Sequence, residues 1–489
     1  MINKSKKNYL YLLFIILILG LFLRAYHLDV PFEGFHAAKE VQFASMAQHF
    51  QEGGHYFVPE THWEGFNTNV FFPGWLVLGS WDLFGSNYEW AARLPFLIMG
   101  LLSIVLVYLI GKEMYNKKIG LFAAFFLAVS PMAAYFSRNV QGESPLIFFS
   151  LLTIYLFFLF KRTKKIKFFY LSSFSLLFAS MSKYTTLYIL FPIIIYYYLN
   201  RKEFNLNFKN WILYVAIPLI PTFLYMQYVK SIVSELNFAT NFDFIDMGLT
   251  NLSSILDFNG LIYRVIHLIG GVNPIPIFLT MFLIYLIIKK GWLKNDEFIF
   301  YWLISYFLVY LSFLNIATPG NNYYLISFIP PICLIAGRGI MQIKNKFVIS
   351  TLIFLTILIS FFSLLIIYDV NYPYKDAGNE LSILLAPGED FYRVGDPSVC
   401  YYSGHRCYPS ESGYNLFEMN YNYLSIQSAI FNRDIIYDQE SVDYINNNFD
   451  LIYNVTGNVR ILKGTTFTPG EEPEYELIYI RKQVMSFQT

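Results

Sequence analysis

Ionisable side chains crowd together immediately after the first apolar segment of the chain. Residues 8–23 are almost entirely apolar, and the stretch PFEGFHAAKEVQFASMAQHF at 31–50 follows them closely. Its chemically useful groups are two carboxyls, an imidazole and an ammonium, which belong to Glu33, Glu40, His36 and Lys39. Charged groups beside a membrane span are costly and are usually retained for function. The cluster therefore predicts a reactive or binding site at a membrane surface.

The spacing of three of these residues indicates a shared helix face. His36, Lys39 and Glu40 stand at positions i, i+3 and i+4, and the following QFASMAQHF has helical spacing of its apolar residues. Glu40 is then a candidate general base, and Lys39 is a candidate cation for binding a negatively charged group. The alternative is a solvated pair of charges on a helix, which contributes only a few tenths of a kcal/mol.

The composition is that of a membrane protein. Of the 489 residues, 56% are hydrophobic and 14% are charged, and the mean hydropathy is +0.43. A net charge of +1 gives no support for nucleic-acid binding. The sequence has no glycine-rich phosphate loop and no Ser/His/Asp arrangement, so nucleotide-driven chemistry has no support either.

Apolar segments predict a mainly α-helical polytopic fold with about eleven transmembrane helices. We expect the spans at 8–24, 94–111, 119–136, 145–160, 167–182, 184–200, 211–229, 261–288, 297–316, 322–337 and 347–368. Lysine and arginine clusters fall on alternate connections, so the positive-inside rule predicts a multi-pass cell-membrane protein with a cytoplasmic N-terminus. Residues 25–93 and 369–489 would then be extracytoplasmic.

Two extracytoplasmic regions have their own organisation. The first loop contains VFFPGWLVLGSWDLF, which predicts a Trp-bearing segment on the membrane interface. We expect a membrane domain over 1–370 and a small soluble α/β domain over 371–489, because strand-like runs appear in the polar tail. Cys400 and Cys407 in this tail are either a disulfide or two free thiols.

Residues 92–158 resemble a known family. The stretch ARLPFLIMGLLSIVLVYLIGKEMYNKKIGLFAAFFLAVSPMAAYFSRNVQGESPLIFFSLLTIYLFF is similar to GT-C glycosyltransferases, in particular the family-39-like group of protein mannosyltransferases and lipid A aminoarabinose transferases. The long first loop, the Ser-Lys at 182–183 and YYLISFIPPICLIAG at 323–337 follow the family's order. The resemblance covers about the first 370 residues.

The resemblance implies an inverting transfer of a sugar from a polyprenyl-phosphate donor, with a catalytic carboxylate on the first loop. The family's Asp-Glu pair aligns with Lys39-Glu40, so either Glu33 or Glu40 must supply the base. Asn69 stands where the family has a basic phosphate ligand, and Asn321 stands where a His often precedes the tyrosine pair.

Other polar residues at span ends have two interpretations each. Glu143 either faces the cavity of the first-loop acid, as in the family, or pairs with Arg138 to fix a turn. Lys183 either holds the lipid phosphate or anchors a helix end at the interface. Lys39 and Arg138 are further candidate cations for offsetting the charge of that phosphate. Tyr323 and Tyr324, with Asn321 beside them, either line the groove for the donor or belong to an aromatic belt at the membrane interface.

We therefore expect a membrane glycosyltransferase that acts on the outer face, with a lipid, a glycan or a protein as acceptor. The alternatives are a transporter or flippase for lipid-linked sugars and a non-catalytic binder of them. A divalent metal is a candidate for offsetting phosphate charge. No residue is assigned to it, because His55 and His62 with Glu60 or Glu64 match no strong metal signature.

Overall fold

The computed structural model describes residues 4–34, 36–61, 65–66, 70–204, 206–235, 258–290, 296–312, 319–368, 372–409, 421–427, 439–457, 461–462, 469–470 and 474–482. The chain divides into two compact units. Unit 1 comprises residues 1–28, 68–73 and 93–364, and unit 2 comprises 29–67, 74–92 and 365–489. Unit 2 therefore joins most of the first loop to the C-terminal segment. The predicted domain boundary after residue 370 lies near the last division between the units, and it stays a prediction.

Long apolar helices make up most of the membrane-type structure, as the sequence predicts. Six described helices are long and apolar enough to cross a membrane, or seven if one bent pair counts as a span. They include α1 (Lys4–Ala25), α4 (Glu89–Met114), α7 (Glu143–Thr163), α10 (Phe208–Glu235), α17 (Lys346–Tyr368) and the segment Asn322–Ile340, which is part of η3 (Pro319–Phe328) and α16 (Ile329–Ile340). The mainly α polytopic fold is confirmed, and the count of eleven stays a prediction.

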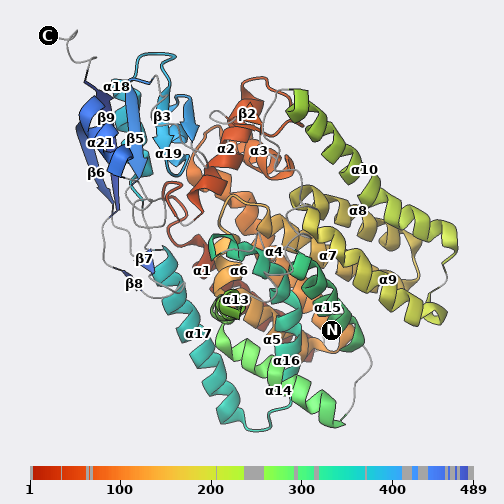
Figure 1. Cartoon of the computed structure of the whole chain (residues 1–489). Helices are drawn as coiled ribbons and strands as arrows, with labels where there is room; N and C mark the ends of the chain where they lie inside the picture. The colour runs from red at the N-terminus through yellow and green to blue at the C-terminus, as the bar shows by residue number, and fades with distance from the viewer. Residues whose placement is uncertain are drawn as a thin grey trace. The chain divides into compact units, whose positions relative to one another are not determined.

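Shorter helices complete unit 1 (Figure 1). They are α5 (Lys117–Val129), α6 (Pro131–Phe136), α8 (Ile166–Ser182), η1 (Tyr184–Ile189), α9 (Leu190–Leu199), η2 (Arg201–Glu203), α13 (Phe258–Val272), α14 (Pro274–Lys290) and α15 (Asp296–Ser312). The Asn322–Ile340 window is fully buried, whereas that of α17 is only 17% buried. Unit 1 thus has an internal helix at α16, while α17 keeps an apolar surface that suits contact with lipid.

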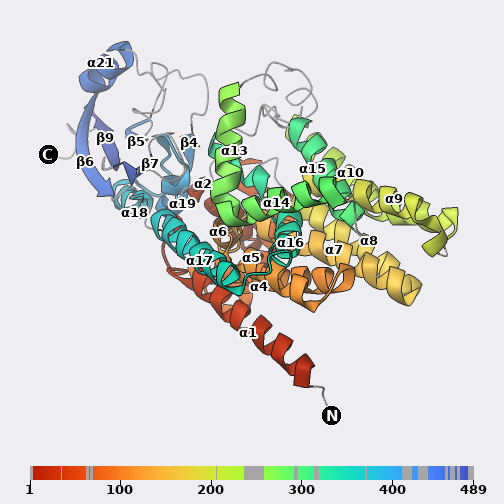
Figure 2. The same cartoon turned by 90° about the horizontal axis from the view of Figure 1, so that it is seen from below.

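The expected span at 261–288 is not a continuous helix. The helices α13 and α14 meet at an angle of 106°, a bend that Figure 2 shows. Asn273 between them is fully buried and has a φ of +96°, a conformation that Asn tolerates better than most residues. Its amide donates to Thr356 O at 3.0 Å and to Ser360 Oγ at 2.9 Å on α17, and its Oδ1 accepts the Ile275 N–H. Tertiary hydrogen bonds therefore fix a bend that hydropathy does not reveal.

The expected span at 119–136 is also divided, between α5 and α6. Pro131 starts α6, so the helix ladder is interrupted after Ser130. Arg24 of α1 is 1% exposed and donates to the carbonyls of Leu127 and Ala128 at 3.2 and 2.7 Å. These carbonyls lie at the end of α5, where helical partners are missing. The guanidinium therefore satisfies backbone groups that lipid could not.

The first loop in unit 2 forms the helices that its sequence favours. The predicted helical stretch is α2 (Ala37–Gln51), and the Trp-bearing segment is α3 (Phe72–Phe84), of which residues 74–84 belong to unit 2. Between them lies a short antiparallel pair, β1 (Glu60–Thr61) and β2 (Gly65–Phe66). Gly74 approaches α2 closely, because an added Cβ would lie 2.8 Å from the sulfur of Met46. The two helices therefore pack directly on each other.

The C-terminal part of unit 2 is a small α/β structure. Its sheet has the order β4-β3-β5-β9-β6, with β3 parallel to β4 and β5 and the remaining pairs antiparallel. The strands are β3 (Phe391–Val394), β4 (Cys407–Pro409), β5 (Tyr423–Gln427), β6 (Phe449–Gly457) and β9 (Glu474–Arg481), and β7 (Ile461–Leu462) pairs with β8 (Pro469–Gly470). The helices are α18 (Tyr374–Leu384), α19 (Ser398–Ser403) and α21 (Gln439–Asn448).

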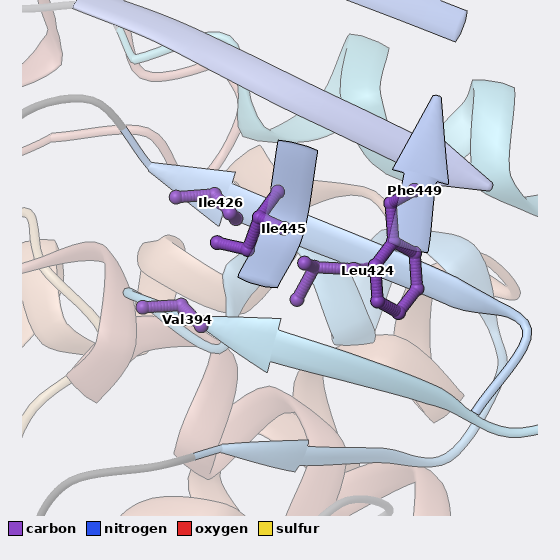
Figure 3. Close-up of a cluster of buried hydrophobic side chains, with 5 residues drawn as sticks. All are labelled: Val394, Leu424, Ile426, Ile445 and Phe449. Carbon is purple, nitrogen blue, oxygen red and sulfur yellow. The ribbon is translucent and has the colours of Figure 1, made fainter. Parts of the chain in front are cut away.

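One apolar cluster joins α21 to the C-terminal sheet (Figure 3). Its members are Val394, Leu424, Ile426, Ile445 and Phe449, all of them buried. Because Leu424 and Ile426 alternate along β5 with Ser425, this face of the strand is apolar. The cluster gives this part of the chain a core of its own.

Cys400 and Cys407 form a disulfide between α19 and β4, with Cα atoms 5.8 Å apart. Cys333 is the remaining cysteine of the chain and is buried. Titration of the denatured protein should therefore find one thiol without reductant and three with it. Because the closed loop is short, replacing both bridged cysteines by Ser should lower the free energy of unfolding by roughly 2 kcal/mol. Three thiols without reductant would contradict the bridge.

Candidate functional site

A partly buried ion pair lies at one end of α7 and α8 in unit 1. Glu143 opens α7 and is 3% exposed, and Lys183 follows the last residue of α8. The Lys183 Nζ lies 2.6 Å from Glu143 Oε1. The same ammonium lies 4.0 Å from the ring centre of Tyr323 and 4.3 Å from that of Tyr324. Four of the predicted site residues are therefore brought together by three segments distant in sequence.

A close backbone approach holds this group in place. Gly142 precedes Glu143, and a Cβ added there would lie 2.4 Å from Ser182 O. The turn before α7 can therefore touch the end of α8 only because residue 142 has no side chain. The carboxyl of Glu143 and the ammonium of Lys183 start from backbone segments in contact, which favours a short ion pair.

The tyrosine pair is positioned from α15 and η1. The hydroxyl of Tyr306 donates to Tyr324 O, and its ring packs 4.7 Å from that of Tyr188. Tyr188 in turn accepts the Trp302 indole N–H at 2.8 Å. These buried hydrogen bonds fix η3 so that both rings face the Lys183 ammonium. An ammonium over aromatic faces is stabilised by cation–π attraction, which strengthens when water is excluded.

Arg138 binds the backbone that follows α1. It is 4% exposed and donates to Tyr26 O at 2.6 Å and to His27 O. Glu143 pairs with Lys183, and the alternative of a turn fixed by Arg138 and Glu143 stays a prediction. Arg138 fixes the chain that leaves α1, and its predicted contact with phosphate stays a prediction.

The sequence analysis missed three polar residues beside these positions. Gln141 Nε2, Tyr184 Oη and Asn322 Oδ1 are buried, and the described part of the chain offers them no hydrogen-bond partner. Each residue is one or two positions from Glu143, Lys183 or Tyr323. Buried polar atoms without partners are rare and costly. They are therefore candidates for contact with a polar ligand. The sequence could have identified them, because each is a polar residue next to an apolar span.

The remaining first-loop candidates lie on or before α2 in unit 2. His36 precedes the helix, and its carbonyl accepts the N–H groups of both Lys39 and Glu40. The predicted i, i+3, i+4 spacing is therefore realised. The Lys39 ammonium donates to Gln42 at 3.1 Å, and Glu40 is buried with 2% exposure. The Glu40 carboxyl is therefore sheltered from water. Such an environment fits a general base better than it fits a solvated pair of charges on a helix surface.

The C-terminal segment caps α2. His36 makes no side-chain cap, and instead the Asp396 carboxylate accepts the Ala38 N–H at 3.2 Å. Asp396 also accepts the N–H and hydroxyl of Ser398, and burial raises the pKa of its carboxyl. A carboxylate at a helix N-terminus stabilises the helix. The position of Lys39 and Glu40 in unit 2 thus depends on a residue far along the chain.

Glu33 is tied to the start of α18. Its Oε1 accepts the Lys375 N–H at 2.8 Å, and its carbonyl accepts the Tyr372 N–H. Lys375 also pairs with Glu89 at 2.8 Å. Burial raises the pKa of Glu33 to about 7, against the lowering effect of the Lys375 N–H. A carboxyl with a pKa near neutrality can accept a proton at physiological pH.

Two candidates lie outside what can be described. Asn69 is outside the described residues, and Asn321 lies in η3 but its side chain does not belong to the described set. The described ranges contain no group of three or more His, Cys, Asp or Glu side chains that could hold a metal. In the first loop, His49 Nε2 lies 2.9 Å from Glu60 Oε2. The candidate divalent metal therefore has no assigned ligands.

We predict that the Glu143–Lys183 pair is strongly coupled. Lys183→Met should leave a buried carboxylate unpaired and lower the free energy of unfolding by about 3–5 kcal/mol. The double variant Glu143→Gln/Lys183→Met should lose clearly less than the sum of the single losses, as measured by denaturant unfolding in detergent. The control is the Arg162–Glu113 pair, in which the Arg162 side chain is 53% exposed, so Arg162→Met should cost under about 1 kcal/mol. Additive losses at 143 and 183 would contradict the coupling.

Glu33 predicts a specific pH dependence. Its pKa is raised from 4.5 to about 7, so the folded carboxyl binds its proton more tightly than the unfolded one. Its contribution to stability is therefore complete below pH 4.5 and is lost as the pH rises through 7. Glu33→Gln keeps an acceptor for the Lys375 N–H and should raise the free energy of unfolding at alkaline pH by about 3 kcal/mol. The control is Asp450→Asn, because the Asp450 side chain is 46% exposed and its pair with Lys482 is long, at 3.9 Å. Identical pH profiles for wild type and Glu33→Gln would refute the prediction.

Comparisons with known proteins agree with this architecture. Residues 69–225 match the family model described as dolichyl-phosphate-mannose-protein mannosyltransferase. No match is found among curated proteins. The structure is similar to ArnT from Cupriavidus metallidurans bound to undecaprenyl phosphate, with a TM-score of 0.60, 12% identity and 98% of each chain covered.

A second solved structure has the same architecture over a smaller share of its length. It is the Archaeoglobus fulgidus oligosaccharyltransferase in its apo form, with a TM-score of 0.57 and 12% identity, covering 86% of this chain and 70% of that one. At these identities the likeness establishes the fold alone. Together with the family match, it shows that this chain carries the GT-C fold of the protein mannosyltransferase and ArnT type.

Proposed function

We propose that the protein is an integral-membrane glycosyltransferase. It would move a sugar from a polyprenyl-phosphate donor to a lipid, glycan or protein acceptor on the extracytoplasmic face. The observation that carries the proposal is the Lys183 ammonium, held between Glu143 and the rings of Tyr323 and Tyr324. An ammonium has three donors and is a common phosphate ligand. A sheltered cation is what a departing lipid phosphate requires.

The choice of donor rests on the solved proteins of the same fold. ArnT from Cupriavidus metallidurans was solved with undecaprenyl phosphate, and AglB from Archaeoglobus fulgidus with dolichol-phosphate and an inhibitory peptide. The AglB structure has a TM-score of 0.55 and 12% identity, and covers 87% of this chain and 70% of that one. Both ligands share a long isoprenoid and a phosphate. This shared chemistry supports a polyprenyl-phosphate carrier here.

The proposed reaction is one inverting displacement at the anomeric carbon. The acceptor hydroxyl or amine forms a bond to that carbon while the bond from the carbon to the phosphate oxygen breaks. The acceptor proton goes to a first-loop carboxyl, which we assign to Glu40 with Glu33 as the alternative base. Lys183 and Lys39 offset the negative charge left on the phosphate. Arg138 would add to this positive charge or act by fixing the chain after α1.

The disulfide supports an extracytoplasmic position for the C-terminal segment. Disulfides persist in oxidising compartments and are rare in the cytosol. The Cys400–Cys407 bridge therefore agrees with the charge pattern, which puts residues 25–93 and 369–489 outside. The proposed reaction would then take place on the outer side of a cell membrane.

Transfer from a radiolabelled polyprenyl-phosphate sugar in purified membranes tests the proposal. Loss of a general base typically lowers a rate 10²–10⁴-fold, so Glu40→Gln should reduce turnover by about that factor and leave expression and donor binding intact. Glu33→Gln tests the alternative base. The control is Glu52→Gln, an exposed carboxyl just beyond α2, which should transfer like wild type.

The other outcomes separate the competing functions. Loss of transfer in Glu33→Gln alone would assign the base to Glu33, and unchanged transfer in both variants would exclude a first-loop carboxylate and leave Glu143. Donor binding by wild type without transfer would favour a non-catalytic binder. Movement of the intact lipid-linked sugar between leaflets of proteoliposomes would favour a flippase.

A further inference from the structure

Unpaired positive charge gathers where four helices of unit 1 end. Six exposed cations lie in the turn between α7 and α8, in the connection between α9 and α10, and in the first turns of α8 and α10. We call them the basic cluster: Lys164, Lys165, Lys167, Arg201, Lys202 and Lys209. The two connections touch, because Lys161 pairs with Glu203 at 2.9 Å and the Lys164 ammonium donates to Glu203 O. Both lie at the right of Figure 1.

The acids nearby do not neutralise the basic cluster. Glu203 is paired with Lys161, and Glu113 is paired with Arg162 at 2.6 Å, so each of these acids is engaged by a cation outside the cluster. The first turns of α8 and α10 contain no acid. Within the described ranges, no ion pair joins a carboxylate to any of the six cations. The cluster therefore retains a large uncompensated charge.

The backbone at Lys164 is adapted to keep this turn in place. Lys164 ends α7 with a φ of +58°, a left-handed conformation in which Gly is the usual residue. Such a conformation costs a bulky residue free energy, and it persists where the surroundings fix it. The Lys164 ammonium lies 5.8 Å from the Phe204 ring centre besides its bond to Glu203 O. Its side chain thus ties together the two connections that carry the cations.

Apolar side chains beside the basic cluster distinguish a lipid from a soluble anion. On α8, Ile166 and Leu171 are 41% and 50% exposed, and on α10, Phe208 and Ile212 are 79% and 53% exposed. Exposed apolar groups next to cations fit the boundary between acyl chains and headgroups. A water-soluble phosphate would gain nothing from them.

We propose that the basic cluster binds the headgroups of anionic glycerophospholipids in the leaflet that it faces. The phosphates would lie against Lys165, Lys167 and Lys202, and the acyl chains would follow the apolar faces of α8 and α10. The proposal is independent of sugar transfer, because all of the cluster lies at the opposite ends of α7 and α8 from Glu143 and Lys183. Its role would be to recruit a shell of anionic lipid.

The test uses the full-length protein in nanodiscs with photoreactive phosphatidylglycerol or phosphatidylcholine as the probe. We expect phosphatidylglycerol to label peptides from 160–210 preferentially. The variant Lys165→Gln/Lys167→Gln/Lys202→Gln should lose affinity by about 100-fold, at about fivefold for each cation. The matched control Lys112→Gln/Lys117→Gln/Lys118→Gln neutralises another turn of unit 1 and should retain that labelling.

Three results would overturn the proposal. They are equal labelling by the two lipids, an equal loss in both triple variants, and displacement of the lipid probe by millimolar inorganic phosphate, which would indicate a site for a soluble anion. If the first triple variant does not fold, the Lys→Arg variant at the same three positions should keep the preference for phosphatidylglycerol, and wild-type labelling should fall as salt is raised.

Discussion

The ion pair of the partly buried Lys183 and the buried Glu143 is the interaction on which the site in unit 1 depends. The Glu143 side chain is only 4% exposed, so its carboxylate would lose hydration without a nearby cation to compensate. The pair persists since Gly142 lets two helix ends touch and two tyrosine rings cover the ammonium. The buried hydrogen bonds of Tyr188, Tyr306 and Trp302 fix η3, and they thereby hold the two tyrosine rings against the ammonium.

Local patterns in the sequence predict the parts of the structure that are governed by local forces. The spacing of apolar residues predicts α2, and the runs of apolar residues predict the long helices from α1 to α17. Polar residues at the ends of apolar segments identify Glu143, Lys183 and the tyrosine pair as candidates. An ionisable group at such a position is costly unless it has a partner, and tyrosine is enriched at membrane interfaces.

Long-range partners were beyond prediction, because nothing in a local pattern encodes them. Glu33 meets the Lys375 N–H across 342 positions, and Asp396 caps a helix 358 positions before it. The bend at Asn273 depends on Thr356 and Ser360, whereas the hydropathy pattern predicts one continuous span there. The pairing of Cys400 with Cys407 was open for the same reason, since spacing alone does not determine where α19 and β4 lie.

The composition of unit 2 has a consequence for how the chain threads the membrane. Hydrogen bonds join the first loop to the C-terminal segment at Glu33 and Lys375 and at Ala38 and Asp396, so both parts belong to one compact unit, and we expect both on the same side of the membrane. On that expectation, the chain crosses the membrane an even number of times from the start of α4 to the end of α17. Whether the bent pair α13–α14 crosses the membrane then decides if the number of the other crossings is odd or even. If it crosses, the other segments from α4 to α17 must cross an odd number of times, and if it only dips into the bilayer, they must cross an even number.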